Sequence, residues 1–316
     1  LDPIALLGRL HSFAQPSEVG EPIELLRAGV VFHARGLINS RVVQHNLDWV
    51  WPYWIERQFD PRDASFIPRA FSITHVNLSH RNWTAVGVPD CDELPIVDPR
   101  GLLTPLFDGW SLDGWLIADD GRVLLPSRAA ACRQRLQMDP ASRVVTTTEG
   151  DGLVLTSTAW VDQQDGGAAC RMHLEARAES AGWLVVALRP YNPEGISFIH
   201  EVRLAAERDA WLVDDRHRVR FSAAAERHHV SDYRHGDVFI HLADLDDQQD
   251  GRCDVGMVTA AALFPLRAGN TAEVTATIPL GEERCPAPVH DWAAVHEGRC
   301  RLVCPESRYR FLFDAA

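Results

Sequence analysis

The sequence predicts a mainly β fold: a large antiparallel β-sandwich with a short N-terminal helix and a C-terminal linker helix. Runs rich in Val, Leu, Thr and Trp recur from residue 143 onward, and turns rich in Asp and Gly separate them, as in hairpins. No helical periodicity lies between these runs, which predicts roughly eight or more successive strands, as in a sandwich. The 316 residues, 46% hydrophobic and 24% charged, suffice for one large β domain or two medium ones.

The predicted elements begin with a short helix. Residues Asp2–Phe13 place apolar side chains at helical spacing behind an Asp-Pro start, which is typical of a helix N-terminus. From Val30 to about Arg128 the sequence is less regular, and Trp is interleaved with Pro. Because Pro is confined to strand edges and turns, this region is predicted to hold short strands joined by long ordered loops. Further strands are predicted within residues 143–167, 170–192 and 200–224, and at Asp237–Leu242, Cys253–Phe264 and Ala272–Ile278.

The sequence changes in character after Pro279. Two closely spaced prolines mark a linker, and Asp291 is placed to cap a helix over Trp292–His296. The last segment, Tyr309–Ala316, is predicted to be helical but has too few turns to bury an apolar face. Position 1 is not Met, which predicts a segment of a longer gene product. We therefore predict a β-sandwich domain over residues 1–280, and a linker with the start of a helical domain over residues 281–316.

Composition excludes several classes of function. All 31 residues counted as Lys or Arg are Arg, so there is no lysine for a Schiff base, a pyridoxal-phosphate anchor or a phosphate loop. The 44 acidic residues give a net charge of −13, so nucleic acid and anionic membranes are not expected partners. No apolar run approaches the roughly 18 residues of a membrane span. Seven cysteines, an odd number at low density, predict mostly reduced, buried thiols and a cytoplasmic protein.

Tryptophan is the most informative residue type, because six of the ten Trp residues fall between positions 49 and 115. Trp49, Trp51 and Tyr53 alternate as on a strand, which places their rings on one face. Aligned flat rings suit the apolar faces of sugars, and charged groups nearby suit sugar hydroxyls. The competing interpretation is that the rings fill the core of a wide sandwich. The predicted sugar-binding residues are Trp49, Trp51 and Tyr53 as stacking surfaces, with Arg57, Asp90 and Asp92 as hydroxyl partners.

Two groups of potential metal ligands occur along the chain. The first group matches no helical metal motif, so solvated side chains on a hairpin are favoured over a transition-metal site. The second group contains no CxxC pair, which makes a structural zinc the weaker alternative. We therefore predict no bound metal and no cofactor. The groups are His228, His229, His235 and His241 with Asp232 and Asp237, and then Cys285, His290, His296, Cys300 and Cys304.

Three stretches carry a resemblance to a known family: GLINSRVVQHNLDWVWPYWIERQF (36–59), SFIPRAFSITHVNLSHRNWTAVG (65–87) and LRPYNPEGISFIHEV (188–202). They resemble the N-terminal β-supersandwich part of bacterial glycogen-debranching-like glycoside hydrolases, whose catalytic unit is a following six-hairpin α/α toroid. The resemblance covers nearly the whole chain, and residues 291–316 are similar to the linker and the first toroid helix. It implies a carbohydrate partner and a helical catalytic domain in the same polypeptide. Because the general acid and base of that family lie in the toroid, no catalytic residue is predicted in this chain.

Three functions follow as hypotheses, in order of preference. The first is a non-catalytic domain of an α-glucan-active glycoside hydrolase that packs on the toroid and shapes its cleft, which predicts an exposed apolar patch near the C-terminus. The second is a self-sufficient sugar-active enzyme, similar to aldose mutarotases, in which a His and a carboxylate converge in a pocket. The third is a structural module with buried tryptophans and no cleft. Candidates for the second are His75, His80 and His173 with Glu175 or Glu201.

Overall fold

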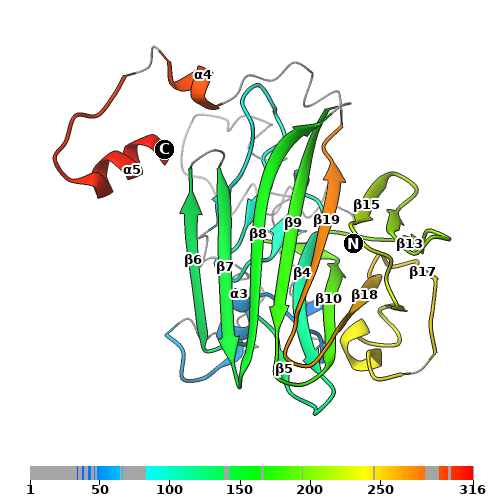
Figure 1. Cartoon of the computed structure of the whole chain (residues 1–316). Coiled ribbons are helices and arrows are strands. Elements are labelled where there is room, and N and C mark those ends of the chain that lie inside the picture. The colour runs from blue at the N-terminus through cyan, green and yellow to red at the C-terminus, as the bar shows by residue number, and fades with distance from the viewer. Residues whose placement is uncertain are drawn as a thin grey trace, which may run out of the picture.

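The predicted fold class is confirmed by the computed structural model (Figure 1). Two antiparallel sheets face each other across one large core, and short helices lie at the margins. The structure describes residues 34, 38, 42–43, 46, 48–64, 66, 83–138, 142–164, 167–193, 195–244, 246–281, 292–297 and 300–315. The helix predicted at the N-terminus, Asp2–Phe13, lies outside these residues.

The first sheet has eight strands and lies behind the other in Figure 1. Its three central strands are buried along nearly their whole length, in keeping with their continuous apolar sequence. One face packs on the second sheet, and the other covers a separate apolar cluster that includes Val50 and Trp115. The strands, in spatial order, are β1 (Thr84–Ala85), β2 (Ile96–Val97), β3 (Leu103–Thr104), β4 (Ser111–Ala118), β10 (Gly182–Arg189), β18 (Thr259–Leu266) and β16 (Arg227–Ser231), with β5 (Val123–Leu124) paired to β4.

The second sheet has nine strands, and its long strands β6–β9 and β19 form the front of the molecule in Figure 1. Alternation is clear on β9, where Cys170, Met172 and Leu174 point into the core while Arg171 and His173 face outward. Its spatial order is β17 (Asp250–Arg252), β13 (Glu201–Leu204), β14 (Ala210–Val213), β15 (His217–Phe221), β19 (Thr271–Pro279), β9 (Gly167–Arg177), β8 (Leu153–Gln164), β7 (Arg143–Gly150) and β6 (Ala131–Gln137).

Several predicted strands are confirmed, and one is wrong. The pair Asp151–Gly152, with φ of 49° and 73°, closes the predicted β7–β8 hairpin, because two left-handed residues match the twist of its strands. Residues 237–242, predicted as a strand, instead contain the 3₁₀ helix η2 (Val238–His241). The Asp237 side chain accepts a hydrogen bond from the Phe239 backbone N–H at 3.1 Å and caps this turn. Alternation of residue types along the sequence does not reveal such a cap.

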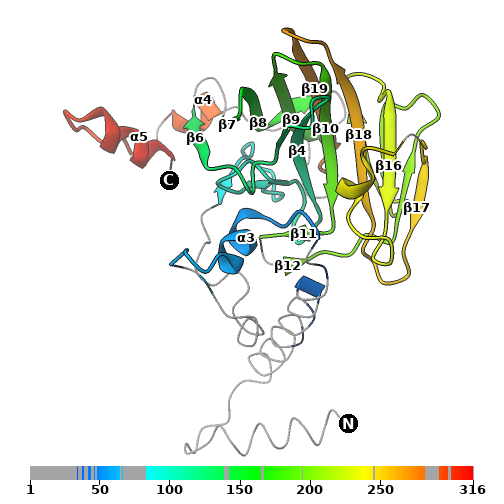
Figure 2. The ribbon, with the colours of Figure 1, turned by 90° about the horizontal axis from the view of Figure 1, so that it is seen from below.

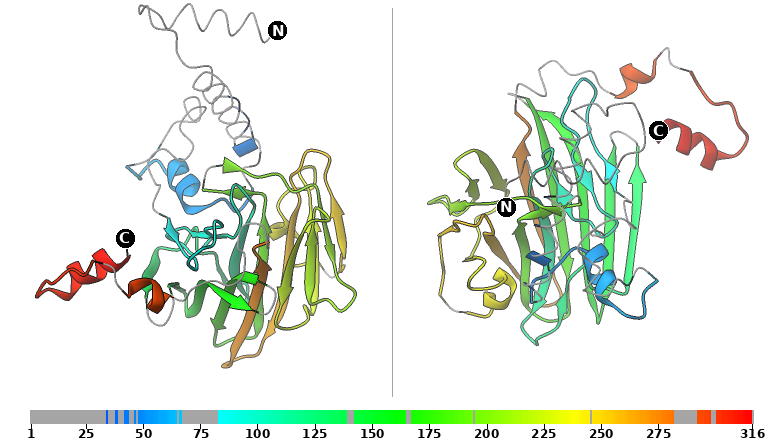
Figure 3. Two further views of the ribbon diagram at one scale, coloured as in Figure 1. Left: turned by 90° about the horizontal axis from the view of Figure 1, so that it is seen from above. Right: turned by 180° about the vertical axis from the view of Figure 1, so that it is seen from behind.

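The remaining elements surround the sandwich. Strands β11 (Tyr191–Asn192) and β12 (Gly195–Ile196) form a small separate ladder, and helix α3 (Tyr53–Phe59) follows the aromatic segment. Near the end of the chain, the predicted helices are confirmed as α4 (Trp292–His296) and α5 (Ser307–Ala315). Figures 2 and 3 show α5 standing off the sandwich. The division into domains at residue 280 remains a prediction.

A buried carboxylate lies in the turn between β2 and β3. Asp98 Oδ1 accepts hydrogen bonds from the Arg100 and Leu102 backbone N–H groups at 2.8 and 2.9 Å. Asp98 Oδ2 is buried and has no hydrogen-bond partner within the described part of the chain. Burial raises the pKa of Asp98 to about 7, the two backbone hydrogen bonds oppose the rise, and the nearby Asp113 carboxylate adds to it. The folded protein therefore favours the protonated form of this carboxyl.

We expect the substitution Asp98→Asn to become more stabilising, relative to the parent chain, as pH rises from 4 to 8. Between the ordinary aspartate pKa of 3.8 and about 7, the folded chain binds more protons at Asp98 than the unfolded chain, so this carboxyl makes the parent less stable as pH rises. The amide oxygen of Asn can still accept both backbone N–H groups. Urea unfolding of both proteins across this range should show a difference that grows by about 2–4 kcal/mol. A difference independent of pH would contradict the raised pKa.

Candidate functional site

The predicted aromatic stacking surface is buried. Trp49 and Trp51 are each 1% exposed, and their rings stack at 5.6 Å between centroids, while Tyr53 is also buried. The alternating strand predicted for these residues is wrong, because Tyr53 is the first residue of α3 and follows Pro52. Rings closed off from solvent offer no face to a sugar, so their position favours the competing interpretation, that they fill the core.

The polar partners predicted for a sugar lie in two places. Arg57 on α3 donates to Asp63 at 2.6 Å, and this hydrogen bond raises the pKa of Arg57. Its guanidinium lies 5.9 Å from the Tyr53 ring centroid. Asp90 and Asp92 are exposed in the loop between β1 and β2, and among the described residues no hydrogen bond or ion pair joins either to Arg57. A sugar-binding role for these residues therefore remains a prediction.

A buried ion pair joins the aromatic segment to the first sheet, and sequence reasoning missed it. Arg189, at the end of β10, is fully buried and forms a two-pronged ion pair with Asp237, with one contact of 2.8 Å from Nη1 to Oδ1. Its Nη2 also donates to the Val50 carbonyl at 3.0 Å, and Tyr191 Oη donates to the same oxygen at 2.7 Å. The only sequence signal is a charged residue ending an apolar run. This centre holds residues 49–51 in place.

The Arg189 side chain stays protonated although it is buried. Burial alone would lower the pKa of Arg189, but the Asp237 carboxylate outweighs burial and holds this pKa above its ordinary value. The guanidinium carbon lies 5.1 Å from the Trp115 ring centroid and 5.8 Å from that of Trp49, distances suited to cation–π attraction. All these groups are buried, so the arrangement acts on stability and offers no open position to a substrate.

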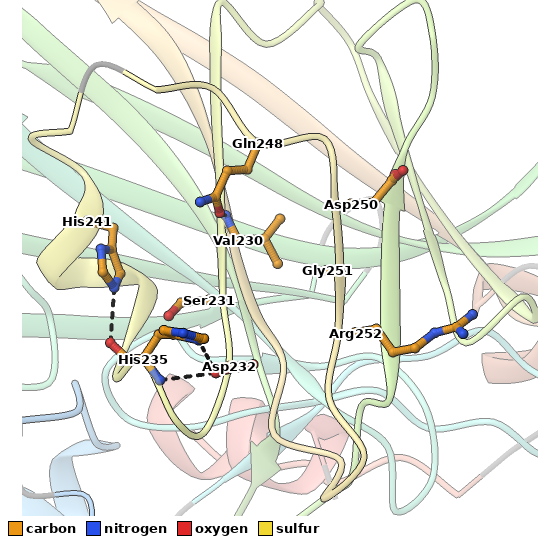
Figure 4. A pocket seen from close by; sticks show the side chains of 9 residues that line it. All are labelled: Val230, Ser231, Asp232, His235, His241, Gln248, Asp250, Gly251 and Arg252. Carbon is orange, nitrogen blue, oxygen red and sulfur yellow. Dashed lines mark hydrogen bonds and ion pairs between the residues drawn. The ribbon is translucent and has the colours of Figure 1, made fainter.

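An open pocket of about 310 Å³ lies where the terminal strands of the two sheets, β16 and β17, come together (Figure 4). Its histidines are among those singled out in the sequence. The His235 ring lies 2.7 Å from Asp232, Nδ1 to Oδ1, and the same oxygen accepts the Arg234 and His235 backbone N–H groups. We call this the edge pocket; it is lined by Val230, Ser231, Asp232, His235, His241, Gln248, Asp250, Gly251 and Arg252.

Three titratable groups of the edge pocket, Asp232, His241 and Arg252, are each paired with a neighbour. Burial alone would raise the pKa of Asp232, but its hydrogen bonds from His235 and the backbone hold this pKa below the usual range. The His241 ring lies between the Asp244 carboxylate, 3.1 Å from Nδ1, and the His235 carbonyl, 3.0 Å from Nε2. Arg252 binds Glu201 at 2.7 Å.

The other two histidines of the predicted cluster do not join this pocket. His228 accepts a hydrogen bond from the Trp211 indole N–H at 2.8 Å, and its other ring nitrogen faces the Gln248 carbonyl. Burial lowers the pKa of His228 to about 4, so the ring is neutral at pH 7. His229 is buried on the same strand. Among the described residues no group of three or more His, Cys, Asp or Glu side chains could hold a metal ion.

A larger groove of about 780 Å³ lies at the end of β19, beside Leu280 and Gly281. Two aromatic residues on its rim are exposed, Phe107 by 77% and Phe198 by 47%. Its floor includes Trp110, whose ring packs edge-on against His217 at 6.3 Å. Burial and the neighbouring Arg216 lower the pKa of His217. The groove therefore combines apolar and polar groups at the point where the chain leaves the second sheet.

The exposed apolar patch predicted near the C-terminus is confirmed. Helix α5 has no buried residue, and Leu312 and Phe313 on it are 52% and 44% exposed. Val303, just before it, is 94% exposed. Apolar side chains left exposed on a short helix without buried residues are typical of an interaction surface.

Cysteine usage differs in one place from the prediction of reduced thiols. Cys91 is disulfide-bonded. Cys170 and Cys253 are free and buried, and burial raises the pKa of Cys170, which keeps it a thiol. Cys132, Cys300 and Cys304 are also free.

No protein-family model matches the chain, and no curated protein matches it. Among solved structures it is similar to a bacterial glucoamylase complexed with acarbose, at 10% identity and a TM-score of 0.44, covering 64% of this chain and 34% of that one. It is also similar to a 4-α-glucanotransferase from Thermococcus litoralis, at 10% identity and a TM-score of 0.35, covering 78% and 49%. A putative kojibiose phosphorylase from human microbiome gives 7% identity and a TM-score of 0.29, covering 62% and 25%.

These similar structures are carbohydrate-active enzymes, and this chain spans between a quarter and a half of their length. Each of these similarities has a TM-score below 0.5 and a sequence identity of 10% or less, and none of them identifies a family for this chain.

Proposed function

We propose that this chain is a non-catalytic β-sandwich domain of a glycoside hydrolase acting on α-glucan-like carbohydrate. It packs on a helical catalytic domain of the same polypeptide and shapes the sugar cleft of that domain. The observation that carries the proposal is the exposed apolar surface of α5 and the segment before it. Apolar surface gathered at one end of a chain favours association with another structural element.

The position of the linker supports the same proposal. Helix α4 is tied to the sandwich by a hydrogen bond of 3.1 Å from the Trp292 indole N–H to the Gly87 carbonyl. The groove with exposed Phe107 and Phe198 lies at the end of β19, where the chain leaves the second sheet. A domain packed against α5 would stand close to this end of the sandwich.

The deciding experiment compares the protein of the full encoding gene with the present chain. Both are assayed for glucose release from α-glucans. We expect release only from the longer protein. Activity of the present chain alone would overturn the non-catalytic role.

The double substitution Leu312→Asp and Phe313→Asp is expected to separate docking from folding. Because α5 has no buried residue, the thermal midpoint of the present chain should stay unchanged within about 1 °C. In the longer protein the same change places two carboxylates in the proposed interface, which should lower activity at least about tenfold. The matched control is Arg308→Gln with Arg310→Gln on the same helix. Equal activity of the Asp variant and the parent would contradict the docking role.

The alternative, a self-sufficient enzyme of aldose-mutarotase type, is not favoured by the residues suggested for it. His173 lies on the outer face of the second sheet, and its Nδ1 is 3.0 Å from the Thr275 hydroxyl. Glu201 on β13 binds Arg252. Within the described chain no hydrogen bond joins His173 to Glu175 or Glu201, while His75 and His80 lie outside it.

The third hypothesis, a structural module, predicts buried tryptophans and no cleft. Trp49 and Trp51 are buried, but the edge pocket and the groove are both open to solvent. This combination favours a domain with binding surfaces over a purely structural one.

Location, cofactors and metals remain predictions for this chain. None of the described helices has the length and apolar character needed to cross a bilayer. The disulfide at Cys91 argues against the predicted cytoplasmic location, because disulfides persist mainly in oxidising compartments.

A further inference from the structure

We propose that the edge pocket binds a small, neutral, polyhydroxylated molecule, a free aldose of monosaccharide size. This site is separate from the apolar docking surface at α5, and the inference does not depend on the proposed function. It rests on three features of the pocket: a floor shaped by a glycine, two polar side chains with free hydrogen-bonding atoms, and charged side chains that are either paired with a neighbour or directed away from the hollow.

The floor of the pocket exists because residue 251 is glycine. A Cβ atom at Gly251 would lie 2.0 Å from Val230 Cγ1, far inside contact distance. The absence of that atom lets β17, the last strand of the second sheet, approach β16, the last strand of the first. The two sheets therefore meet at β16 and β17 beside an open hollow with a small apolar floor. Its volume, about 310 Å³, is at the low end of small-molecule sites.

Two polar side chains that line this hollow keep a hydrogen-bonding atom without a partner in the described chain. Gln248 points toward Val230 in Figure 4; its Oε1 accepts the Val230 backbone N–H at 3.4 Å, and its amide nitrogen has no hydrogen-bond partner in the described chain. His235 is fixed through Nδ1 by Asp232, and its Nε2 has no partner among the described residues. The two groups thus present one fixed amide donor and one ring nitrogen that can donate or accept.

The charged residues around the hollow disfavour an ionic ligand. Asp250 and Arg252 alternate with Gly251 on β17, so their side chains point away from Val230, as Figure 4 shows. Arg252 is paired with Glu201 and directed away from the hollow, so it is not placed to bind a phosphate there. A hydroxyl both donates and accepts, so a molecule with several hydroxyls can satisfy Gln248 and His235 together without adding charge.

Saturation-transfer NMR with D-glucose, D-galactose and D-mannose tests the proposal on the present chain. We expect at least one of these sugars to bind at roughly 10 mM or below. The substitution Gln248→Leu should weaken binding about tenfold, because it removes the free amide donor and keeps the side-chain size. The matched control is Gln249→Leu, since Gln249 is the exposed neighbour that does not line the pocket, and it should bind as the parent does.

A second variant guards against misfolding. His235 is exposed on the turn after β16, so the substitution His235→Phe should leave the thermal midpoint unchanged. The same substitution should also weaken sugar binding. Inorganic phosphate and Ca²⁺ serve as ionic probes. Binding of either ion in place of the sugars, absence of sugar binding, or equal loss in Gln249→Leu would each overturn the proposal. None of these results bears on the docking of α5, which the Leu312 and Phe313 variants test separately.

Discussion

The substitution Asp237→Asn is expected to lower the free energy of unfolding by about 3–5 kcal/mol, because it leaves the Arg189 guanidinium buried without a counter-charge. Asp237 accepts from Arg189 and also from the Val50 backbone N–H at 2.8 Å. An amide in its place turns one acceptor oxygen into a donor that faces other donors. The change should also loosen residues 49–51, which the ion pair holds against β10.

Urea unfolding followed by tryptophan fluorescence measures this loss, and two further variants test its cause. Arg57→Ala removes an ion pair whose Arg57 side chain is 44% exposed, and it should cost less than about 1 kcal/mol. Combining Asp237→Asn with Arg189→Met removes the unpaired charge and should recover part of the stability. If Asp237→Asn and Arg57→Ala proved equally mild, the buried ion pair would not stabilise the fold as argued.

Trp211→Ala should destabilise the protein by a similar amount, about 3–5 kcal/mol, through loss of a large buried side chain. Trp211 on β14 is fully buried, and its ring meets the Phe221 ring edge-on at 4.8 Å. Its indole N–H is also the donor to the neutral His228 ring. The substitution therefore opens a cavity and leaves a buried acceptor without its hydrogen bond.

Two comparisons separate these contributions in the same urea experiment. Trp211→Phe keeps most of the ring volume but loses the hydrogen bond, so its loss should be about 1–3 kcal/mol. Trp160→Ala removes a half-buried tryptophan on the outer face of β8, where the Arg143 guanidinium lies 5.1 Å from the ring centroid, and should cost about 1–2 kcal/mol. A loss for Trp160→Ala as large as that for Trp211→Ala would contradict the assignment of Trp211 to the core.

Local sequence signals predicted the strands correctly where the burial of each side chain follows from the residue types next to it in the chain. Strand β9 alternates between core and solvent, and an Asp-Gly turn links β7 to β8, so residue type and spacing suffice. The same reasoning predicted Trp292–His296 as a helix. It could not reveal that β9 and β10, which follow each other in the chain, belong to different sheets.

The candidate sites depended on distant contacts and were predicted less well. The aromatic residues 49–53 looked like a binding face because alternation does not tell which face of a strand is covered. Contacts from Arg189 and Asp237, 48 positions apart, hold this segment where its rings are buried. The edge pocket was visible only as histidines in the sequence, since the approach of β16 to β17 that creates it depends on contact between Val230 and Gly251.

By itself, the sequence determined that this protein is a mainly β sandwich without lysine chemistry, and that an apolar segment lies near the C-terminus. These properties are local or compositional, so they can be inferred without knowing which strands pair. Only the tertiary structure decided that the tryptophans of residues 49–51 pack in the core and that an open pocket lies where the two sheets meet. Burial and cavities arise between segments far apart in the chain, and no periodicity within one segment records what will cover it.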